Sequence, residues 1–240
     1  MTDTTRLAAD TAMGPVTLDV ADLDAMTAYY RDAVGLSVLD SAGPVVTLGR
    51  AGRAADGAAG DAGGASTPLV VLRHSPALRH AGPREAGLFH TAILFETQAA
   101  LAAAVYTVAT THPNRFTGSS DHIVSQAVSF DDPEGNGVEM YWDRDRTQWS
   151  WVHGSVEMAT LFLDPNAFLR EHLTDEAIAA HGSAPAVVGH VHLSVGDIAT
   201  ARRFYVDQLG FDLTNAYGEQ AIFVSAGGYH HQMALRVGRS

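Results

Sequence analysis

The stretch Pro15-Val-Thr-Leu-Asp-Val-Ala-Asp-Leu23 returns later in the chain as His190-Val-His-Leu-Ser-Val-Gly-Asp-Ile198. The two copies continue without a gap as far as Gly35-Leu36 and Gly210-Phe211. Val, Leu, Asp, Tyr and Gly recur at matching places, and most other positions keep their apolar or polar character. An internal repeat of this kind indicates that the chain is built from similar folded units.

Each copy predicts a strand followed by a helix. Apolar residues alternate with polar ones at its start, which is the pattern of a strand with one buried face. Asp22 and Asp197 then stand where a helix N-cap is expected. Apolar positions at helical spacing follow, up to Gly35 and Gly210, because glycine commonly ends a helix in the left-handed conformation.

Short β segments follow each predicted helix, so each copy becomes a βαβββ unit. Between the two copies lies a more diverged unit that begins with the same strand and helix. The predicted segments are strands Leu36–Leu39, Val45–Leu48 and Pro68–Leu72 in the first unit, strand Leu88–Phe95, helix Gln98–Thr110 and strands Ile123–Phe130 and Gly137–Trp142 in the second, and strands Phe211–Thr214, Ala221–Ser225 and Gln232–Val237 in the third. The turn before Gly137 is rich in turn-forming residues.

We therefore expect an α+β fold of repeated βαβββ modules that form cleft-shaped mixed sheets, with three modules present and a fourth absent. The predicted parts are a non-catalytic first module over residues 14–75, a second module over 86–143, a connector over 144–188 and a third module over 189–240. The Gly/Ala-rich stretch from Ala51 to Thr67 predicts a mobile loop between strands. The connector is predicted to hold one helical segment, Asn166 to Ala180.

Composition narrows the functional classes. The 240-residue chain has no cysteine, so any cofactor must be held by His, Asp, Glu or backbone groups. Its formal net charge of -12 argues against a nucleic-acid or anionic-membrane partner. We expect cytoplasmic residence, because no apolar run reaches ~18 residues and the stretch from Met1 to Met13 lacks the features of a signal peptide.

Five stretches carry a resemblance to a known family. They are Gly87-Leu-Phe-His90-Thr-Ala-Ile-Leu94, Asp121-His122-Ile-Val-Ser125, Asp132-Pro-Glu-Gly-Asn-Gly-Val-Glu139-Met-Tyr141, Gly189-His-Val-His-Leu193 and Ser225-Ala-Gly-Gly-Tyr-His-His231. With the repeated units, they resemble the vicinal oxygen chelate superfamily of glyoxalases, bleomycin resistance proteins and extradiol dioxygenases. Within it, the likeness is greatest to the two-domain catechol 2,3-dioxygenase-like proteins. It runs from about Gly14 to the C-terminus.

The resemblance implies a metal site. In this family the metal lies in the cleft of two paired βαβββ units, with ligands on the first and last strands. The first-strand positions here are Pro15, His90 and His190, and the last-strand position of the second unit is Glu139. Pro15 cannot bind a metal, which is why the first module is expected to be non-catalytic. His90, Glu139 and His190 form a set that suits Fe(II), or alternatively Mn(II), with positions left open for other ligands.

The same resemblance implies an extradiol ring-cleaving dioxygenase that acts on a catechol-type aromatic diol with O2. His231 matches a histidine that handles a proton in the reaction, and His122 and His230 are predicted to contact the substrate. One position departs from the family pattern. A tyrosine often found about ten residues before the ligand Glu is Ser129 here, which leaves the orientation of the substrate open.

Other interpretations remain open. His192 shares the strand face of His190 and could replace or support it as a ligand. A glyoxalase-type isomerase or lyase usually needs a second Glu, where the third unit offers Gln232 or His231. A non-catalytic small-molecule binding or resistance protein of the same fold is the third option. The site is complete only if the second and third units pair, in which case the first unit would pack against a fourth unit or another subunit of a homo-oligomer.

Overall fold

The computed structural model describes residues 6–51, 66–82 and 85–238. Its first βαβββ unit forms a four-stranded sheet with the order β1-β4-β3-β2, in which β1 and β4 run parallel. The elements are β1 (Val16–Val20), α1 (Leu23–Ala28), the π-helical turn η1 (Tyr29–Ala33), β2 (Ser37–Ala42), β3 (Val45–Ala51) and β4 (Ser66–His74). Most of the insertion between β3 and β4, residues 52–65, lies outside the described residues.

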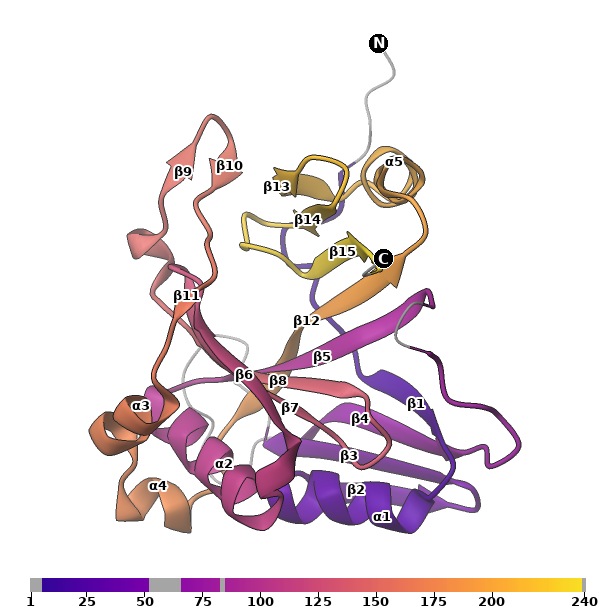
Figure 1. Ribbon diagram of the computed structural model, residues 1–240, viewed down its shortest axis with the longest axis vertical. Helices are drawn as coiled ribbons and strands as arrows, with labels where there is room; N and C mark the ends of the chain where they lie inside the picture. The colour runs from indigo at the N-terminus through magenta and orange to yellow at the C-terminus, as the bar shows by residue number, and fades with distance from the viewer. Residues whose placement is uncertain (1–5, 52–65, 83–84, 239–240) are drawn as a thin grey trace.

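The second and third units share one nine-stranded sheet with the order β11-β6-β7-β8-β5-β12-β15-β14-β13. The second unit consists of β5 (Gly87–Phe95), α2 (Gln98–Thr111), η2 (Pro113–Arg115), β6 (Phe116–Asp121), β7 (Ser125–Asp131) and β8 (Gly137–Asp143). The third consists of β12 (Ala186–Val195), α5 (Ile198–Arg202), η4 (Arg203–Gln208), β13 (Asp212–Tyr217), β14 (Ala221–Ser225) and β15 (Met233–Val237). The antiparallel pairing of β5 with β12 joins the two units (Figure 1).

The predicted helix ends are confirmed. Asp22 accepts a hydrogen bond from the backbone N–H of Ala25 at 2.9 Å. Asp197 does the same for Thr200 at 2.7 Å, so each carboxylate satisfies an N–H that a helix leaves unpaired. The glycines that close the two helices adopt left-handed φ angles of 84° at position 35 and 88° at position 210.

The structure corrects two predictions outside the site. The second unit holds β6, a strand that the sequence pattern did not predict, and β7 begins at Ser125 rather than at Ile123, which has a positive φ. The connector holds two helices instead of one, because Leu173 is extended and Thr174 caps a second helix. The connector elements are η3 (Arg146–Gln148), β9 (Trp151–Val152), β10 (Ser155–Val156), β11 (Leu161–Phe162), α3 (Pro165–His172) and α4 (Asp175–Ala179).

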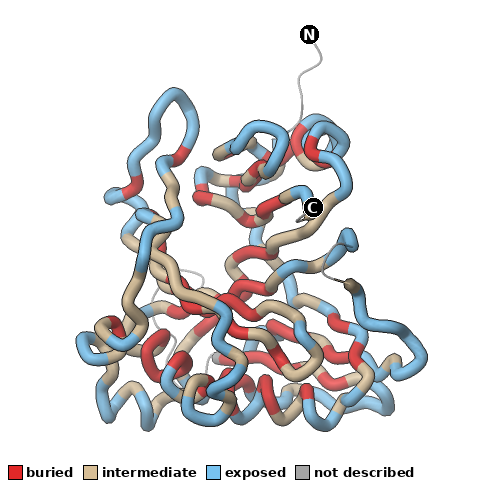
Figure 2. Tube along the Cα trace, viewed as in Figure 1, coloured by how far each residue is buried: buried red, intermediate tan, exposed pale blue. Residues whose placement is uncertain are grey.

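The first and second units share one hydrophobic core. Leu48 and Tyr30 of the first unit belong to the same buried cluster as Phe95 and Val128 of the second. The Tyr30 hydroxyl also donates to Asp132 at 3.1 Å across this boundary. The first unit therefore packs against the second, where we had expected a fourth unit or another subunit. Figure 2 shows buried residues along the central strands and exposed ones on the outer helices and the β9–β10 hairpin.

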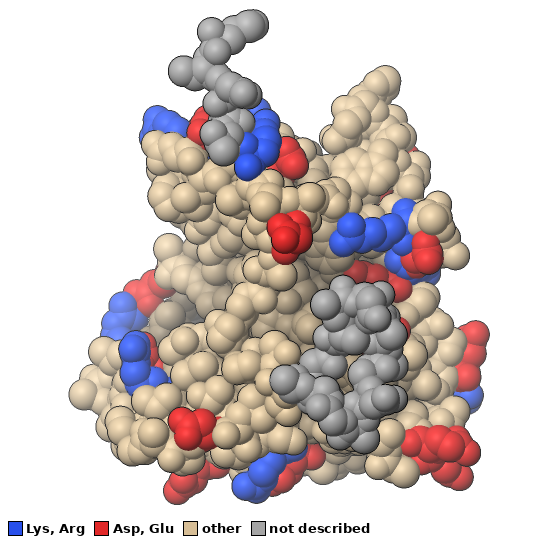
Figure 3. Space-filling view, turned by 180° about the vertical axis from the view of Figure 1, so that it is seen from behind, with Lys and Arg blue, Asp and Glu red and all other residues tan. Residues whose placement is uncertain are grey.

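On the face in Figure 3, arginine side chains lie in small groups among acidic ones and form no continuous basic area. In the part of the chain that the structure describes, every helix is too short or too polar to span a bilayer.

Candidate functional site

Three neighbouring strands, β8, β5 and β12, carry the predicted metal ligands. Ala92 on β5 pairs with Glu139 on one side and with His190 on the other, so the three residues form a row across the sheet. His90 lies two residues before Ala92 and therefore on the same face. Because the side chain between Glu139 and His190 is only a methyl group, the space above it stays open to both of them.

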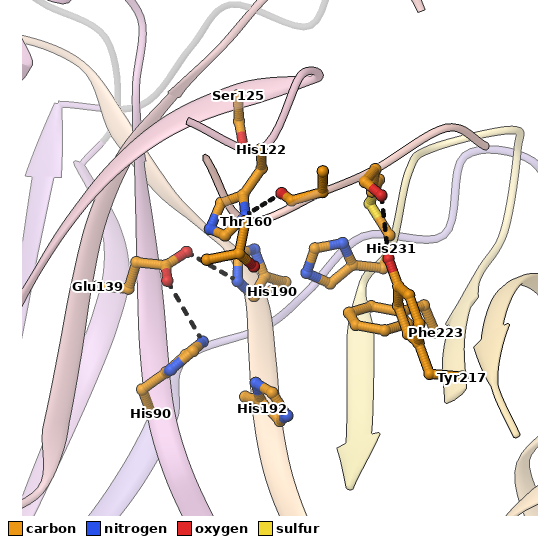
Figure 4. A pocket seen from close by; sticks show the side chains of 12 residues that line it. His90, His122, Ser125, Glu139, Thr160, His190, His192, Tyr217, Phe223 and His231 are labelled. Atoms are coloured by element: carbon orange, nitrogen blue, oxygen red, sulfur yellow. Dashed lines mark hydrogen bonds and ion pairs between the residues drawn. The ribbon is translucent and has the colours of Figure 1, made fainter. Parts of the chain in front are cut away.

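The side chains of His90, Glu139 and His190 point toward one another (Figure 4). His190 Nε2 lies 3.2 Å from Glu139 Oε1, and His90 Nε2 lies 3.8 Å from Glu139 Oε2. One ligand atom from each residue can be chosen so that all lie within 4.8 Å of one another. Among the residues that the structure describes, this is the group of His, Asp and Glu side chains that could hold a metal ion.

The electrostatics of these residues fit a cation. Burial lowers the pKa of His90 to about 4, so this imidazole is neutral at physiological pH. Burial alone would raise the pKa of Glu139, but the attraction of His90 and the contact with His190 hold it below its ordinary value. Within the described residues, buried His90 Nε2 has no hydrogen-bond partner. An unpaired buried nitrogen is costly, and a metal ion would satisfy it.

His192 shares the face but lies outside this group. Its ring is 5.0 Å from the His90 ring in an edge-to-face arrangement, and it lines the same cavity. Burial, and then repulsion by His90 and His190, lowers its pKa to about 3. His192 is therefore a neutral neighbour of the converging residues rather than a member of the group.

A cavity of about 180 Å³ opens beside the three residues. His122 and His231, both predicted to act in the site, lie on its wall, whereas His230 does not. The remaining wall comes from the second and third units and from the connector: Ser125, Met158, Ala159, Thr160, Tyr217 and Phe223. Ser129, the position that departs from the family pattern, lines a neighbouring cavity of about 680 Å³ instead.

The His230-His231 pair lies in the loop between β14 and β15, just before the last strand. Gly227 and Gly228, with φ angles of 62° and 67°, turn the chain there, and β15 begins only at Met233. The His231 ring is 4.2 Å from the His190 ring. His230 is fully buried behind it and contacts Asp143, so the structure does not bring it to the cavity where we had expected a substrate contact.

Sequence reasoning missed the residues that pack against the candidate ligand His190 and hydrogen-bond to one another beside it. Tyr141 packs 4.8 Å from the His190 ring, and its hydroxyl lies 2.7 Å from that of Tyr229. Asp143 bonds to both Tyr229 and His230. The alternation of Glu139, Tyr141 and Asp143 along β8 was the available signal, because every second residue of a strand faces the same side.

Comparisons with known proteins agree with this picture. The sequence model of the Glyoxalase/Bleomycin resistance protein/Dioxygenase superfamily matches residues 12–140 and 187–240. A protein of Bacillus subtilis strain 168 named catechol-2,3-dioxygenase is 33% identical over 231 residues, which cover 95% of this chain and 75% of the relative. The crystal structure of a candidate dioxygenase from Bacillus subtilis aligns with a TM-score of 0.59 at 13% identity. That alignment covers 97% of this chain but only 65% of the other, slightly under two thirds, and it supports the fold alone.

Proposed function

The chain belongs to the Glyoxalase/Bleomycin resistance protein/Dioxygenase superfamily, and on this premise we propose that it is a metal-dependent extradiol dioxygenase that opens the ring of a catechol-type diol with O2. The observation that carries the proposal is the convergence of His90, Glu139 and His190 beside a small cavity. The name of the Bacillus subtilis relative supports the same reaction class.

The donor set supports Fe(II) as the resident metal, with Mn(II) as the alternative. Two imidazoles and one carboxylate leave positions open for a diol and dioxygen. A divalent metal held by His90, Glu139 and His190 would supply Lewis acidity and bring both reactants together. The side chains around it then control how the diol is oriented and where its protons go.

Two histidines of the cavity wall are suited to bind the hydroxyls of a diol. His122 Nδ1 lies 2.9 Å from the carbonyl oxygen of Ala159. A carbonyl only accepts, so Nδ1 must donate, and an imidazole with its single proton on Nδ1 has an acceptor at Nε2. We propose that this atom accepts a hydrogen bond from one substrate hydroxyl, and that His231, beside His190, takes a proton from the reacting diol.

The cavity limits the size of the substrate. Its volume of about 180 Å³ is well below the roughly 300–1,000 Å³ typical of pockets for drug-sized ligands. Phe223 and Tyr217 provide aromatic wall on the side opposite Glu139, and Met158 adds an apolar side chain to the lining. This combination favours a single aromatic ring with small substituents.

A glyoxalase-type isomerase is less well supported. Glu139 pairs with Ala92, the second residue after His90. In the third unit the second residue after His190 is His192, which pairs with Ala234. The position equivalent to Glu139 therefore holds a methyl group, where a second carboxylate would be needed.

The proposal is tested by anaerobic purification, metal analysis and addition of catechol with O2. We expect bound Fe or Mn and a yellow ring-fission product, both lost in Glu139→Gln and in His90→Ala. His74→Ala, which changes an exposed histidine at the end of β4, serves as the matched control and keeps both. A protein that binds diols but neither holds metal nor turns over any catechol of a panel would be a binding protein.

A further inference from the structure

One face of β8 connects the candidate metal site to the cavity wall. Glu139, Tyr141 and Asp143 alternate along this strand and share its face. Asp143 Oδ2 accepts from the Tyr229 hydroxyl at 2.7 Å, and Asp143 Oδ1 lies 2.9 Å from His230 Nε2. His230 Nδ1 in turn lies 2.7 Å from His231 Nδ1. A continuous hydrogen-bonded chain thus runs from Asp143 to His231.

The direction of each hydrogen bond in this chain is set by Asp143, the residue at one end of it. An ionised carboxylate can only accept, so His230 Nε2 must carry the proton that it donates to Asp143. Neutral His230 then has only a lone pair at Nδ1. His231 must therefore donate from its own Nδ1, which leaves its Nε2 as an acceptor. Burial lowers the pKa of His230, which agrees with a neutral ring.

We propose that Asp143 and His230 are positioning residues that hold His231 in the tautomer with a free electron pair at Nε2. His231 lines the cavity and His230 is fully buried behind it, so Nε2 is the nitrogen left for a partner in the cavity. In this tautomer His231 can take a proton from a substrate hydroxyl. The O–H bond breaks, an Nε2–H bond forms, and the electron pair stays on the substrate oxygen.

The opposite tautomer could not perform this step, because its Nε2 would already carry a proton. The tautomer matters as much as the position of the ring, since a correctly placed imidazole with the wrong tautomer is a poor base. The part played by this tautomer in catalysis rests on the proposed function. The tautomer itself can be measured without any substrate.

The experiment is NMR of the full chain labelled with 13C and 15N in histidine, both metal-free and loaded with diamagnetic Zn(II). The Cδ2 chemical shift distinguishes an Nδ1–H from an Nε2–H imidazole, and His230→Gln and His231→Gln assign the two signals. We expect Nε2–H for His230 and Nδ1–H for His231. Finding the proton of His231 on Nε2 in the unsubstituted protein overturns the proposal.

Asp143→Asn provides the decisive comparison. The comparison is made in a Tyr141→Phe background, because the Tyr229 hydroxyl could otherwise donate to Tyr141. With that partner removed it donates to position 143, which turns the amide oxygen of the new side chain toward Tyr229 and its NH2 group toward His230. His230 must then accept at Nε2 and donate from Nδ1, so His231 becomes the Nε2–H tautomer. Tyr229→Phe removes a hydrogen bond from the same carboxylate but leaves its charge, and both tautomers stay unchanged. An unaltered His231 tautomer in Asp143→Asn contradicts the proposal.

Kinetics separate this inference from the proposed function. With the metal loaded, Asp143→Asn is expected to lower kcat roughly 10²-fold, while metal content and KM change little. If the tautomers behave as expected but no catechol is turned over, the proposed function fails and the positioning role stands. If catechol is turned over and the His231 tautomer does not respond to Asp143, the positioning role fails.

Discussion

Tyr141 lies directly against Gly189, so that its hydroxyl occupies the place where any side chain at position 189 would begin. Gly189 falls at a register shift between Val188 and His190 in the β5–β12 ladder. The close approach lets the Tyr141 ring pack under the candidate ligand His190. A glycine next to the candidate ligand is thus required here by packing rather than by an unusual backbone angle.

Gly189→Ala is expected to lower the free energy of unfolding by about 1–3 kcal/mol, as overpacking of a closed core does. It should also weaken metal binding, because Tyr141 and then His190 must move. Gly196→Ala is the matched control, since a Cβ at position 196 meets nothing within 4 Å. Urea denaturation and metal titration provide the measurements. A free energy of unfolding within about 0.5 kcal/mol of that of the unsubstituted protein would contradict this expectation and show that the Tyr141 side chain moves aside at little cost.

Ala92→Val tests the space between Glu139 and His190. The larger side chain would enter the row of three residues across β8, β5 and β12 and prevent Glu139 and His190 from meeting on one ion. Ala104→Val is the control, because Ala104 is equally buried in the core but lies on α2. Both variants are expected to lose about 1–3 kcal/mol of stability. Only Ala92→Val is expected to lose metal binding in isothermal titration calorimetry.

Metal binding should raise the melting temperature, because a ligand that binds only the folded state stabilises it. We expect Mn(II) to raise the Tm of the metal-free protein and the increase to vanish in Glu139→Gln, His90→Ala and His190→Ala. His192→Gln should keep most of it, since His192 lies outside the converging group. The reverse pattern, a shift kept in His190→Ala and lost in His192→Gln, would assign the ligand to His192.

Acidification should destabilise the metal-free protein. The pKa values of His90 and His192 are lowered to about 4 and about 3, from 6.5 in the unfolded chain. Because the unfolded state binds more protons, this stabilisation is complete above about pH 6.5 and is lost as the pH falls toward the folded values. Between pH 8 and pH 5 each residue contributes a loss of about 2 kcal/mol.

Chemical denaturation from pH 5 to pH 8 measures this slope. His192→Gln should lower the slope of the free energy of unfolding against pH by the amount that corresponds to about one bound proton. His74→Gln changes an exposed residue and should leave the slope unchanged. A slope that His192→Gln leaves unchanged would mean that the His192 ring takes up its proton without unfolding.

The repeat in the sequence predicted much of the fold because its signals are local. Asp22 and Asp197 cap helices through contacts three residues away, and such short-range patterns can be identified in a sequence. The meeting of His90, Glu139 and His190 was predicted from the family resemblance and the pairing of two units, and the structure brings these residues together.

The missed features depend on long-range contacts or lack a pattern. β6 has the sequence Phe116-Thr-Gly-Ser-Ser-Asp121, and its one large apolar side chain is exposed, so there is no alternation to detect. The contact of Asp143 with His230 joins positions far apart in the chain. Nothing near either residue indicates its partner, which only the order of strands in the sheet determines.

The ladder between β5 and β12 carries one candidate imidazole ligand on each of its strands. An ion held by both would act as a clasp across this junction, since the strands could not separate without releasing it. Amide protons along the junction would then exchange with solvent at a rate set by metal occupancy. Removal of the ion by a chelator would therefore increase exchange first at the β5–β12 junction, while the core shared by the first and second units stayed protected.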